Sequence, residues 1–238
     1  DFQSTAPYPI EEAYEVADAI GRGEPAALEG ELGDLLFQVV FHARMGEERR
    51  WFDFASIAQA IANKLTERHP HVFAGGQRAS SSELNRAWEE HKARERAERG
   101  SSSAGVPSEL ADVPLALPAL ARAAKLGKRA ARVGFDWPDA RGVRDKIDEE
   151  LREIDALEGE QGGDDRRAEE LGDLLFAVAN WARHQRVDPE EALRLANAKF
   201  ERRFRAMEAL SAARGLTLDS LGPVAWDDLW NEVKSAEK

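Results

Sequence analysis

Two pairs of acidic residues in the second half of the chain have a spacing that suits metal binding. Glu150 and Glu153 lie three residues apart, and so do Glu170 and Asp173. Side chains at this spacing share one face of a helix. The Gly-rich stretch at residues 159–163 predicts a helical hairpin that brings both faces together. Four converging carboxylates repel one another unless cations neutralise them, and all-oxygen ligands suit Mg²⁺ or Mn²⁺ better than zinc.

The same acidic pattern occurs earlier in the chain. The four matching residues are Glu12, Glu15, Glu31 and Asp34. Two further motifs recur, Lys-x-x-x-Arg at residues 64–68 and 199–203, and Trp-x-x-x-Lys at residues 88–92 and 230–234. The chain is therefore an internal duplication with a repeat of about one hundred residues. We expect a secondary metal site in the first copy.

Three other interpretations of the acidic pattern must be weighed. Glutamate-rich helices are commonly solvated surfaces, but paired clusters beside apolar stripes in both halves favour a site. A di-iron bundle requires Glu-x-x-His pairs, and no histidine follows Glu150 or Glu170 at that spacing. A metal-binding scaffold without catalysis stays an alternative.

Polar residues near the second acidic group distinguish the two copies. Asn180 continues the helical line that begins at Glu170, and Phe41 occupies its place in the first copy. Lys146 lies one turn before the second acidic pair, and its counterpart is Tyr8. The second copy thus keeps two polar side chains that the first has lost, so we expect the second copy to be the better catalyst.

A basic pair and a tryptophan follow in the second half. Lys199 and Arg203 lie one helical turn apart and would neutralise phosphate charge beside a metal site. Trp230 either stacks on a base or packs in the core of an amphipathic helix. The residue types therefore favour a small phosphate ligand.

Composition narrows the class of protein. The 238 residues are 42 % hydrophobic and 33 % charged, with a net charge of −12 and no cysteine. Such an acidic chain is a poor partner for nucleic acid or anionic membranes, and thiolate chemistry is excluded. No apolar run reaches the ~18 residues of a membrane helix, and no signal peptide opens the sequence. We expect a cytoplasmic protein.

Helical periodicity extends over nearly the whole sequence, which predicts an all-α fold. The expected helices span roughly residues 9–20, 26–45, 54–68, 80–99, 114–132, 140–157, 165–185, 189–213 and 224–235. A small, polar stretch rich in glycine and serine at residues 100–107 predicts a linker. We expect a first repeat at residues 1–99, a linker at 100–112 and a second repeat at 113–238.

These motifs together resemble the MazG family of nucleoside triphosphate pyrophosphohydrolases. The resemblance rests on Glu-Glu-x-x-Glu followed by Glu-x-x-Asp in both halves, Lys-Leu-x-x-Arg-His-Pro-His-Val-Phe ending at Phe73, Val-Gly-Phe-Asp-Trp ending at Trp137, and Lys-Phe-Glu-Arg-Arg-Phe ending at Phe204. It implies two tandem helical-bundle repeats in a homodimer. It also implies Mg²⁺-dependent conversion of ATP and other NTPs or dNTPs to nucleoside monophosphate and pyrophosphate, in nucleotide-pool house-cleaning or control.

The resemblance also implies roles for individual residues. Glu150, Glu153, Glu170 and Asp173 would bind metal, with Glu149, Glu150 and Glu153 as the catalytic carboxylates. The nucleotide would contact Lys146, Arg166, Asn180, Lys199, Arg203 and Trp230. Two departures stand out: Arg166 replaces an expected lysine, and the usual Cys-Pro-Trp-Asp at the start of the first repeat is absent apart from Asp1. The first repeat is therefore expected to be non-catalytic or weakly active, with dimerisation or binding of a regulatory protein as its alternative function.

Overall fold

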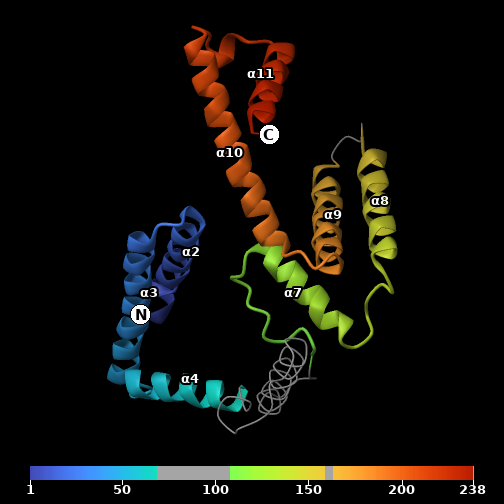
Figure 1. The fold of residues 1–238 in the computed structure, drawn as a ribbon. Coiled ribbons are helices and arrows are strands. Elements are labelled where there is room, and N and C mark those ends of the chain that lie inside the picture. Colours follow the sequence, from blue (N-terminus) through green and yellow to red (C-terminus); the bar gives the residue numbers. More distant parts are fainter. Residues whose placement is uncertain (69–107, 159–162, 238) are drawn as a thin grey trace, which may run out of the picture. The chain divides into compact units, whose positions relative to one another are not determined.

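The structure is a computed structural model that describes residues 1–68, 108–158 and 163–237. Every regular element in these ranges is helical (Figure 1), which confirms the all-α prediction. The chain divides into two compact units, Asp1–Ser102 and Ser103–Lys238. The predicted helix at residues 80–99 and residues 100–107 of the predicted linker lie outside the described ranges. In the described part of the chain, no helix is long and apolar enough to cross a membrane.

The first unit is built on a helical hairpin. Its helices are α1 (Phe2–Thr5), α2 (Pro7–Arg22), α3 (Pro25–Glu48) and α4 (Phe54–Arg68). Helices α2 and α3 lie side by side (Figure 1), because Gly23 adopts a positive φ of 68° and ends α2. Helix α4 begins after Asp53, whose carboxylate accepts a hydrogen bond of 2.7 Å from the backbone N–H of Ser56.

The second unit contains the other acidic hairpin. Its helices are α7 (Ala119–Ala131), α8 (Ala140–Ala156), α9 (Asp164–His184), α10 (Pro189–Ala213) and α11 (Pro223–Ala236), with a 3₁₀ turn at Leu218–Ser220. Asp139 and Asp188 cap α8 and α10 through their carboxylates. The expected start of α7 at residue 114 is wrong. Pro118 adopts ψ 141°, outside the helical range, and the helix begins one residue later.

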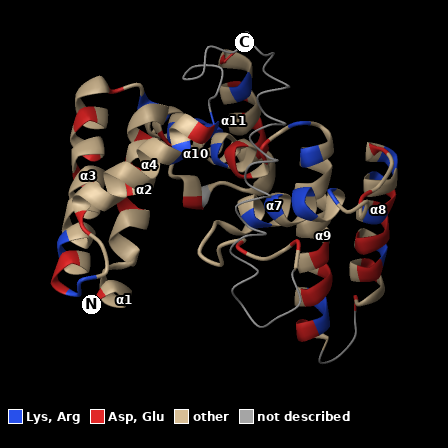
Figure 2. Ribbon diagram, turned by 90° about the horizontal axis from the view of Figure 1, so that it is seen from below, with Lys and Arg blue, Asp and Glu red and all other residues tan. Residues whose placement is uncertain are grey.

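Packing in the second unit sets α8 against α9 and α7 across α9. Figure 2 shows acidic residues along α8 and the adjoining part of α9, with basic residues on α7. Gly127 permits the α7–α9 contact, since a Cβ there would lie 2.3 Å from Oδ1 of Asn180. Helix α11 packs instead on α10, around Met207, Leu229 and Val233. The α8–α9 hairpin therefore presents its carboxylates on a scaffold that α7 braces.

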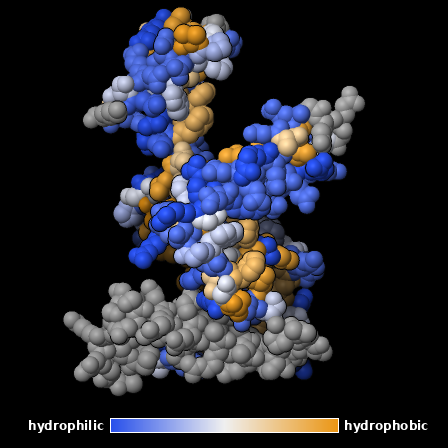
Figure 3. Space-filling model, turned by 90° about the vertical axis from the view of Figure 1, so that its right-hand side faces the viewer, coloured by the Kyte–Doolittle hydropathy of each residue, from blue (hydrophilic) through white to orange (hydrophobic). Residues whose placement is uncertain are grey.

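Large apolar side chains are exposed at equivalent positions of α3 and α9. The exposed pairs are Leu32 and Leu171, Leu36 and Leu175, Phe37 and Phe176, and Val39 and Val178. Hydrophobic patches are visible between strongly hydrophilic surfaces in Figure 3. Because a single exposed leucine is ordinary but a repeated set is not, these faces indicate a surface that another element or chain covers.

Candidate active site

The predicted hairpin brings three of the four predicted metal ligands of the second repeat together. Ligand oxygens of Glu150 on α8 and of Glu170 and Asp173 on α9 all lie within 4.8 Å of one another. Glu153 follows Glu150 by one turn of α8. Desolvation raises the pKa of Glu170, and the nearby charges of Glu153, Glu150 and Asp173 raise it further. The carboxylates therefore form one mutually repelling group, which we call the second carboxylate group.

Glu150 is the buried member of this group. Its side chain is 2 % exposed, and its two oxygens have different surroundings. Oε1 lies 2.8 Å from Nζ of Lys146, whereas Oε2 is buried without a hydrogen-bond partner. A buried carboxylate oxygen normally requires a donor or a cation, because its desolvation is costly. Beside Glu170 and Asp173, this oxygen fits a hard divalent cation such as Mg²⁺.

Lys146 binds two carboxylates at once in this structure. Its Nζ lies 2.6 Å from Oε1 of Glu149, in addition to the contact with Glu150. The hydrogen bond from Lys146 lowers the pKa of Glu149, and those to Glu149 and Glu150 raise the pKa of Lys146. Lys146 and Glu149 thus form an ion pair at the edge of the second carboxylate group. The sequence predicted Lys146 as a nucleotide contact and Glu149 as a catalytic carboxylate.

The first repeat repeats the carboxylate geometry with a different donor. Glu12, Glu31 and Asp34 also have ligand oxygens within 4.8 Å of one another. Desolvation, followed by the charges of Glu31 and Glu12, raises the pKa of Glu15. Oε1 of Glu12 accepts a hydrogen bond of 3.1 Å from Nε2 of Gln38, which is buried on α3. Gln38 was not predicted from the sequence, where its only signal was a polar residue four positions after Asp34 on α3.

Asn180 and Phe41 occupy equivalent positions in the two repeats but have different surroundings. Asn180 is 3 % exposed, packs against Gly127 of α7, and accepts a hydrogen bond of 2.9 Å from Nε of Arg183. Phe41 is exposed, with its ring centroid 5.9 Å from that of Phe37. Both residues are seven positions beyond the aspartate of their repeat, about 10 Å along the helix axis. The structure thus gives Asn180 a packing role, and its contact with nucleotide stays a prediction.

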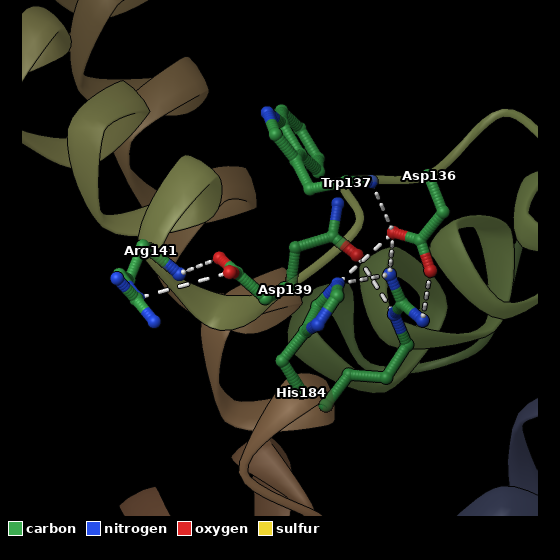
Figure 4. A network of polar contacts seen from close by, with 7 residues as sticks. Asp136, Trp137, Asp139, Arg141 and His184 are labelled. Atoms are coloured by element: carbon green, nitrogen blue, oxygen red, sulfur yellow. Dashed lines mark hydrogen bonds and ion pairs between the residues drawn. The ribbon is translucent and has the colours of Figure 1, made fainter.

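The Val-Gly-Phe-Asp-Trp stretch anchors the turn before α8 to the end of α9. Arg183 donates to both carboxylate oxygens of Asp136, and Nε2 of His184 lies 3.0 Å from Oδ1 (Figure 4). These contacts, led by the hydrogen bond from Arg183, lower the pKa of Asp136 to about 2. The network therefore holds α9 in place from the end opposite the carboxylates, a structural role that the motif alone did not indicate.

Replacing Asp136 by asparagine is expected to lower the free energy of unfolding by about 2 kcal/mol near neutral pH, because Arg183 loses a charge-assisted partner. The folded pKa of Asp136 lies below its unfolded value of 3.8. Its stabilisation is therefore present above about pH 4 and is lost as the pH falls towards about 2. Urea unfolding at several pH values measures the difference, which should shrink over that window.

A matched control for this change is Asp148→Asn. Asp148 pairs with Arg144 at 3.2 Å on the exposed side of α8, where an ion pair contributes about 0 to 1 kcal/mol. Equal unfolding free energies for the Asp136 and Asp148 variants would contradict the anchoring role.

The predicted nucleotide contacts on α10 and α11 form a separate group. The guanidinium carbon of Arg203 lies 5.9 Å from the ring centroid of Trp230, and Arg203 pairs with Glu237 at 2.7 Å. Trp230 packs against Phe200 at 5.6 Å between ring centroids. Arg203 and Glu237 line a surface hollow with Asn231, Lys234 and Ser235. Lys199, one turn before Arg203, and Arg166, in the first turn of α9, are exposed.

Comparison with known proteins identifies the class of enzyme. The model of the MazG nucleotide pyrophosphohydrolase domain matches residues 1–73. The nucleoside triphosphate pyrophosphohydrolase of Escherichia coli K12 is 49 % identical over 238 residues, which cover 99 % of this chain and 88 % of the relative. The nucleoside triphosphate pyrophosphohydrolase/pyrophosphatase MazG of Thermotoga maritima is 40 % identical over 237 residues, covering 99 % and 87 %.

The all-helical fold and these full-length similarities define a nucleotide pyrophosphohydrolase. The chain belongs to the MazG family of nucleoside triphosphate pyrophosphohydrolases, as the sequence motifs predicted. The domain model matches the first repeat, whereas the relatives align with both repeats. The similarity therefore establishes the family, whereas the catalytic role of each repeat must be argued from its own residues.

Proposed function

We propose that this enzyme hydrolyses NTPs and dNTPs to nucleoside monophosphate and pyrophosphate, with Mg²⁺ bound by Glu150, Glu153, Glu170 and Asp173. The substrate class comes from the relatives, which are nucleoside triphosphate pyrophosphohydrolases. The observation that carries the location is Oε2 of Glu150, which is buried without a partner next to two more carboxylates. The donor set is entirely oxygen, which suits Mg²⁺, with Mn²⁺ as an alternative.

The chain's own residues divide the chemistry among them. When bound, Mg²⁺ would lower the pKa of the attacking water and stabilise charge on the phosphoryl oxygens. Glu153 orients the water and accepts its proton. We assign this role to Glu153 rather than Glu149, because the charge of Glu153 acts directly on Glu170 within the second carboxylate group, whereas Glu149 lies at its edge beside Lys146.

The reaction breaks the α–β linkage of the triphosphate. The water oxygen bonds to one of the two phosphorus atoms that flank the α–β bridging oxygen, and the bond from that phosphorus to the bridging oxygen breaks. Lys199 and Arg203 neutralise charge on the β- and γ-phosphates, which become the pyrophosphate product. Pyrophosphate detection with Mg²⁺, with EDTA, and after restoring Mg²⁺ tests the activity. In ¹⁸O-labelled water, the labelled product identifies the phosphorus that is attacked, and release of orthophosphate alone would contradict the proposal.

A second copy of the chain fits the exposed apolar faces. Leu36 and Phe37 on α3 and their equivalents Leu175 and Phe176 on α9 are all exposed, although each lies on a hairpin helix. We infer a homodimer in which these faces are covered, with the first repeat serving mainly in assembly. Light scattering during size-exclusion chromatography measures the mass. A monomer at micromolar concentration would contradict this assembly.

A further inference from the structure

The half-buried Glu12 and the buried Glu150 obtain their hydrogen bonds from opposite helices of their hairpins. Glu12 accepts from Gln38 on α3, whereas Glu150 accepts from Lys146 on its own helix, α8. Neither donor has a counterpart in the other repeat. Tyr8 stands where Lys146 would be, and Ala177 stands where Gln38 would be. Each repeat therefore has one donor for its glutamate, neutral in the first and charged in the second.

A neutral amide suffices to hold the half-buried glutamate of the first repeat. The amide of Gln38 contacts Glu12 at 3.1 Å and leaves the first carboxylate group with the same close spacing as the second. At the more deeply buried Glu150, the second repeat instead places the ammonium group of Lys146. It lies within hydrogen-bond reach of Glu149 and Glu150 and partly offsets the repulsion among the acidic residues.

We propose that Lys146 is an exchangeable counter-ion that couples the binding of metal to the binding of nucleotide. Its ammonium group neutralises Glu149 and Glu150 in the free enzyme and releases Glu150 when the carboxylates take up a divalent cation. The released ammonium then contacts the triphosphate. This inference rests on the proposed function and adds a step that the carboxylates alone do not provide.

The side chain of Lys146 is suited to such an exchange. It is 36 % exposed, whereas Glu150 is 2 % exposed, so the lysine reaches the buried carboxylate from the solvent side. A lysine ammonium is a compact charge on a flexible stem and rotates without moving the helix. Two cations beside one carboxylate repel each other, so uptake of the divalent ion favours departure of the lysine. The metal and the nucleotide therefore each favour the conformation that the other requires.

The Lys146→Gln variant separates the charge from the hydrogen bond. The amide still donates to Glu150, as Gln38 does to Glu12, but it does not compete with a cation. Without nucleotide, the variant is expected to bind Mn²⁺ about tenfold more tightly than the wild type at pH 8, and its KM for NTP should rise by a similar factor. Electron paramagnetic resonance counts free Mn²⁺ and needs no turnover.

Arg144→Gln is the matched control, because it removes one positive charge from α8 where Arg144 pairs with the exposed Asp148. It should bind Mn²⁺ as the wild type does. A non-hydrolysable triphosphate should tighten Mn²⁺ binding in the wild type and much less in Lys146→Gln. Mn²⁺ binding by Lys146→Gln that is no tighter than that by Arg144→Gln would overturn the proposal.

A measurement on the unmodified enzyme covers the case in which Lys146→Gln does not fold. In ¹⁵N-lysine-labelled protein, the ammonium resonance that Lys146→Arg removes should shift with Mg²⁺ alone and shift again with the triphosphate analogue. A Lys146 resonance whose chemical shift does not change with Mg²⁺ would contradict the proposed exchange of counter-ions. If wild-type enzyme released no pyrophosphate from NTP, the proposed function would fail, whereas these binding measurements would still decide the role of Lys146.

Discussion

Replacing Glu170 by glutamine is expected to lower the rate of pyrophosphate release about a thousandfold, since a metal ion supplies several kcal/mol of transition-state stabilisation. Glu170 lies in the second carboxylate group beside the buried Glu150, and an amide oxygen there carries no charge for the cation. The matched change Glu31→Gln should leave more than about half of the activity, because it alters only the first repeat's group. Initial rates at saturating Mg²⁺ measure both effects.

Stability measurements separate lost chemistry from lost folding in these variants. Desolvation and neighbouring carboxylates raise the pKa of Glu170, so its charge is unfavourable in the folded protein without metal. Glu170→Gln should therefore keep or raise the melting temperature in EDTA while it loses activity. If instead Glu31→Gln abolished turnover and Glu170→Gln spared it, the first repeat, where the MazG domain model matches, would be the catalyst.

Local signals in the sequence sufficed for the hairpin that carries the second carboxylate group. Helical spacing places Glu170 and Asp173 on one face of their helix, and the glycines at residues 159–163 predict a turn that pairs this helix with the one carrying Glu150. The start of α10 was equally predictable, since Asp188 caps it and Pro189 occupies its first position. The structure brings these three carboxylates together, and their role as metal ligands stays a prediction.

Contacts between helices distant in the sequence could not be predicted in this way. Gln38 reaches Glu12 across the first hairpin, and its polarity alone does not show which of several neighbours it contacts. Asn180 shares a face of α9 with Glu170, as predicted. That face meets α8 near Glu170 but meets α7 near Asn180, so the side chain of Asn180 contacts Gly127. The ion pair of Asp136 and Arg183 joins residues 47 positions apart. Each case depends on tertiary packing, which helical periodicity does not specify.

Replacing Arg203 by glutamine is expected to lower kcat/KM for NTP about a hundredfold, mainly through KM, because a charge-assisted contact to phosphate is lost. Arg203 is held in a defined place: its side chain is only 20 % exposed, lies over the ring of Trp230, and pairs with Glu237. A preorganised guanidinium binds phosphate in a bidentate manner with little further loss of conformational freedom. Steady-state rates across a range of NTP concentrations measure the change.

The neighbouring Arg202 provides a control with the same charge and the same partner. Its Nε lies 3.3 Å from Glu237, but its side chain is 64 % exposed, and among the described residues no aromatic ring lies beneath its guanidinium. Arg202→Gln should therefore change kcat/KM by less than about threefold, because an exposed cation is screened by solvent and salt. Equal losses in the two variants would show that α10 acts on the triphosphate only through its total charge. A large loss confined to Arg203→Gln would show that the position over Trp230 decides, and would place α10 and α11 in the nucleotide site with the carboxylates of the α8–α9 hairpin.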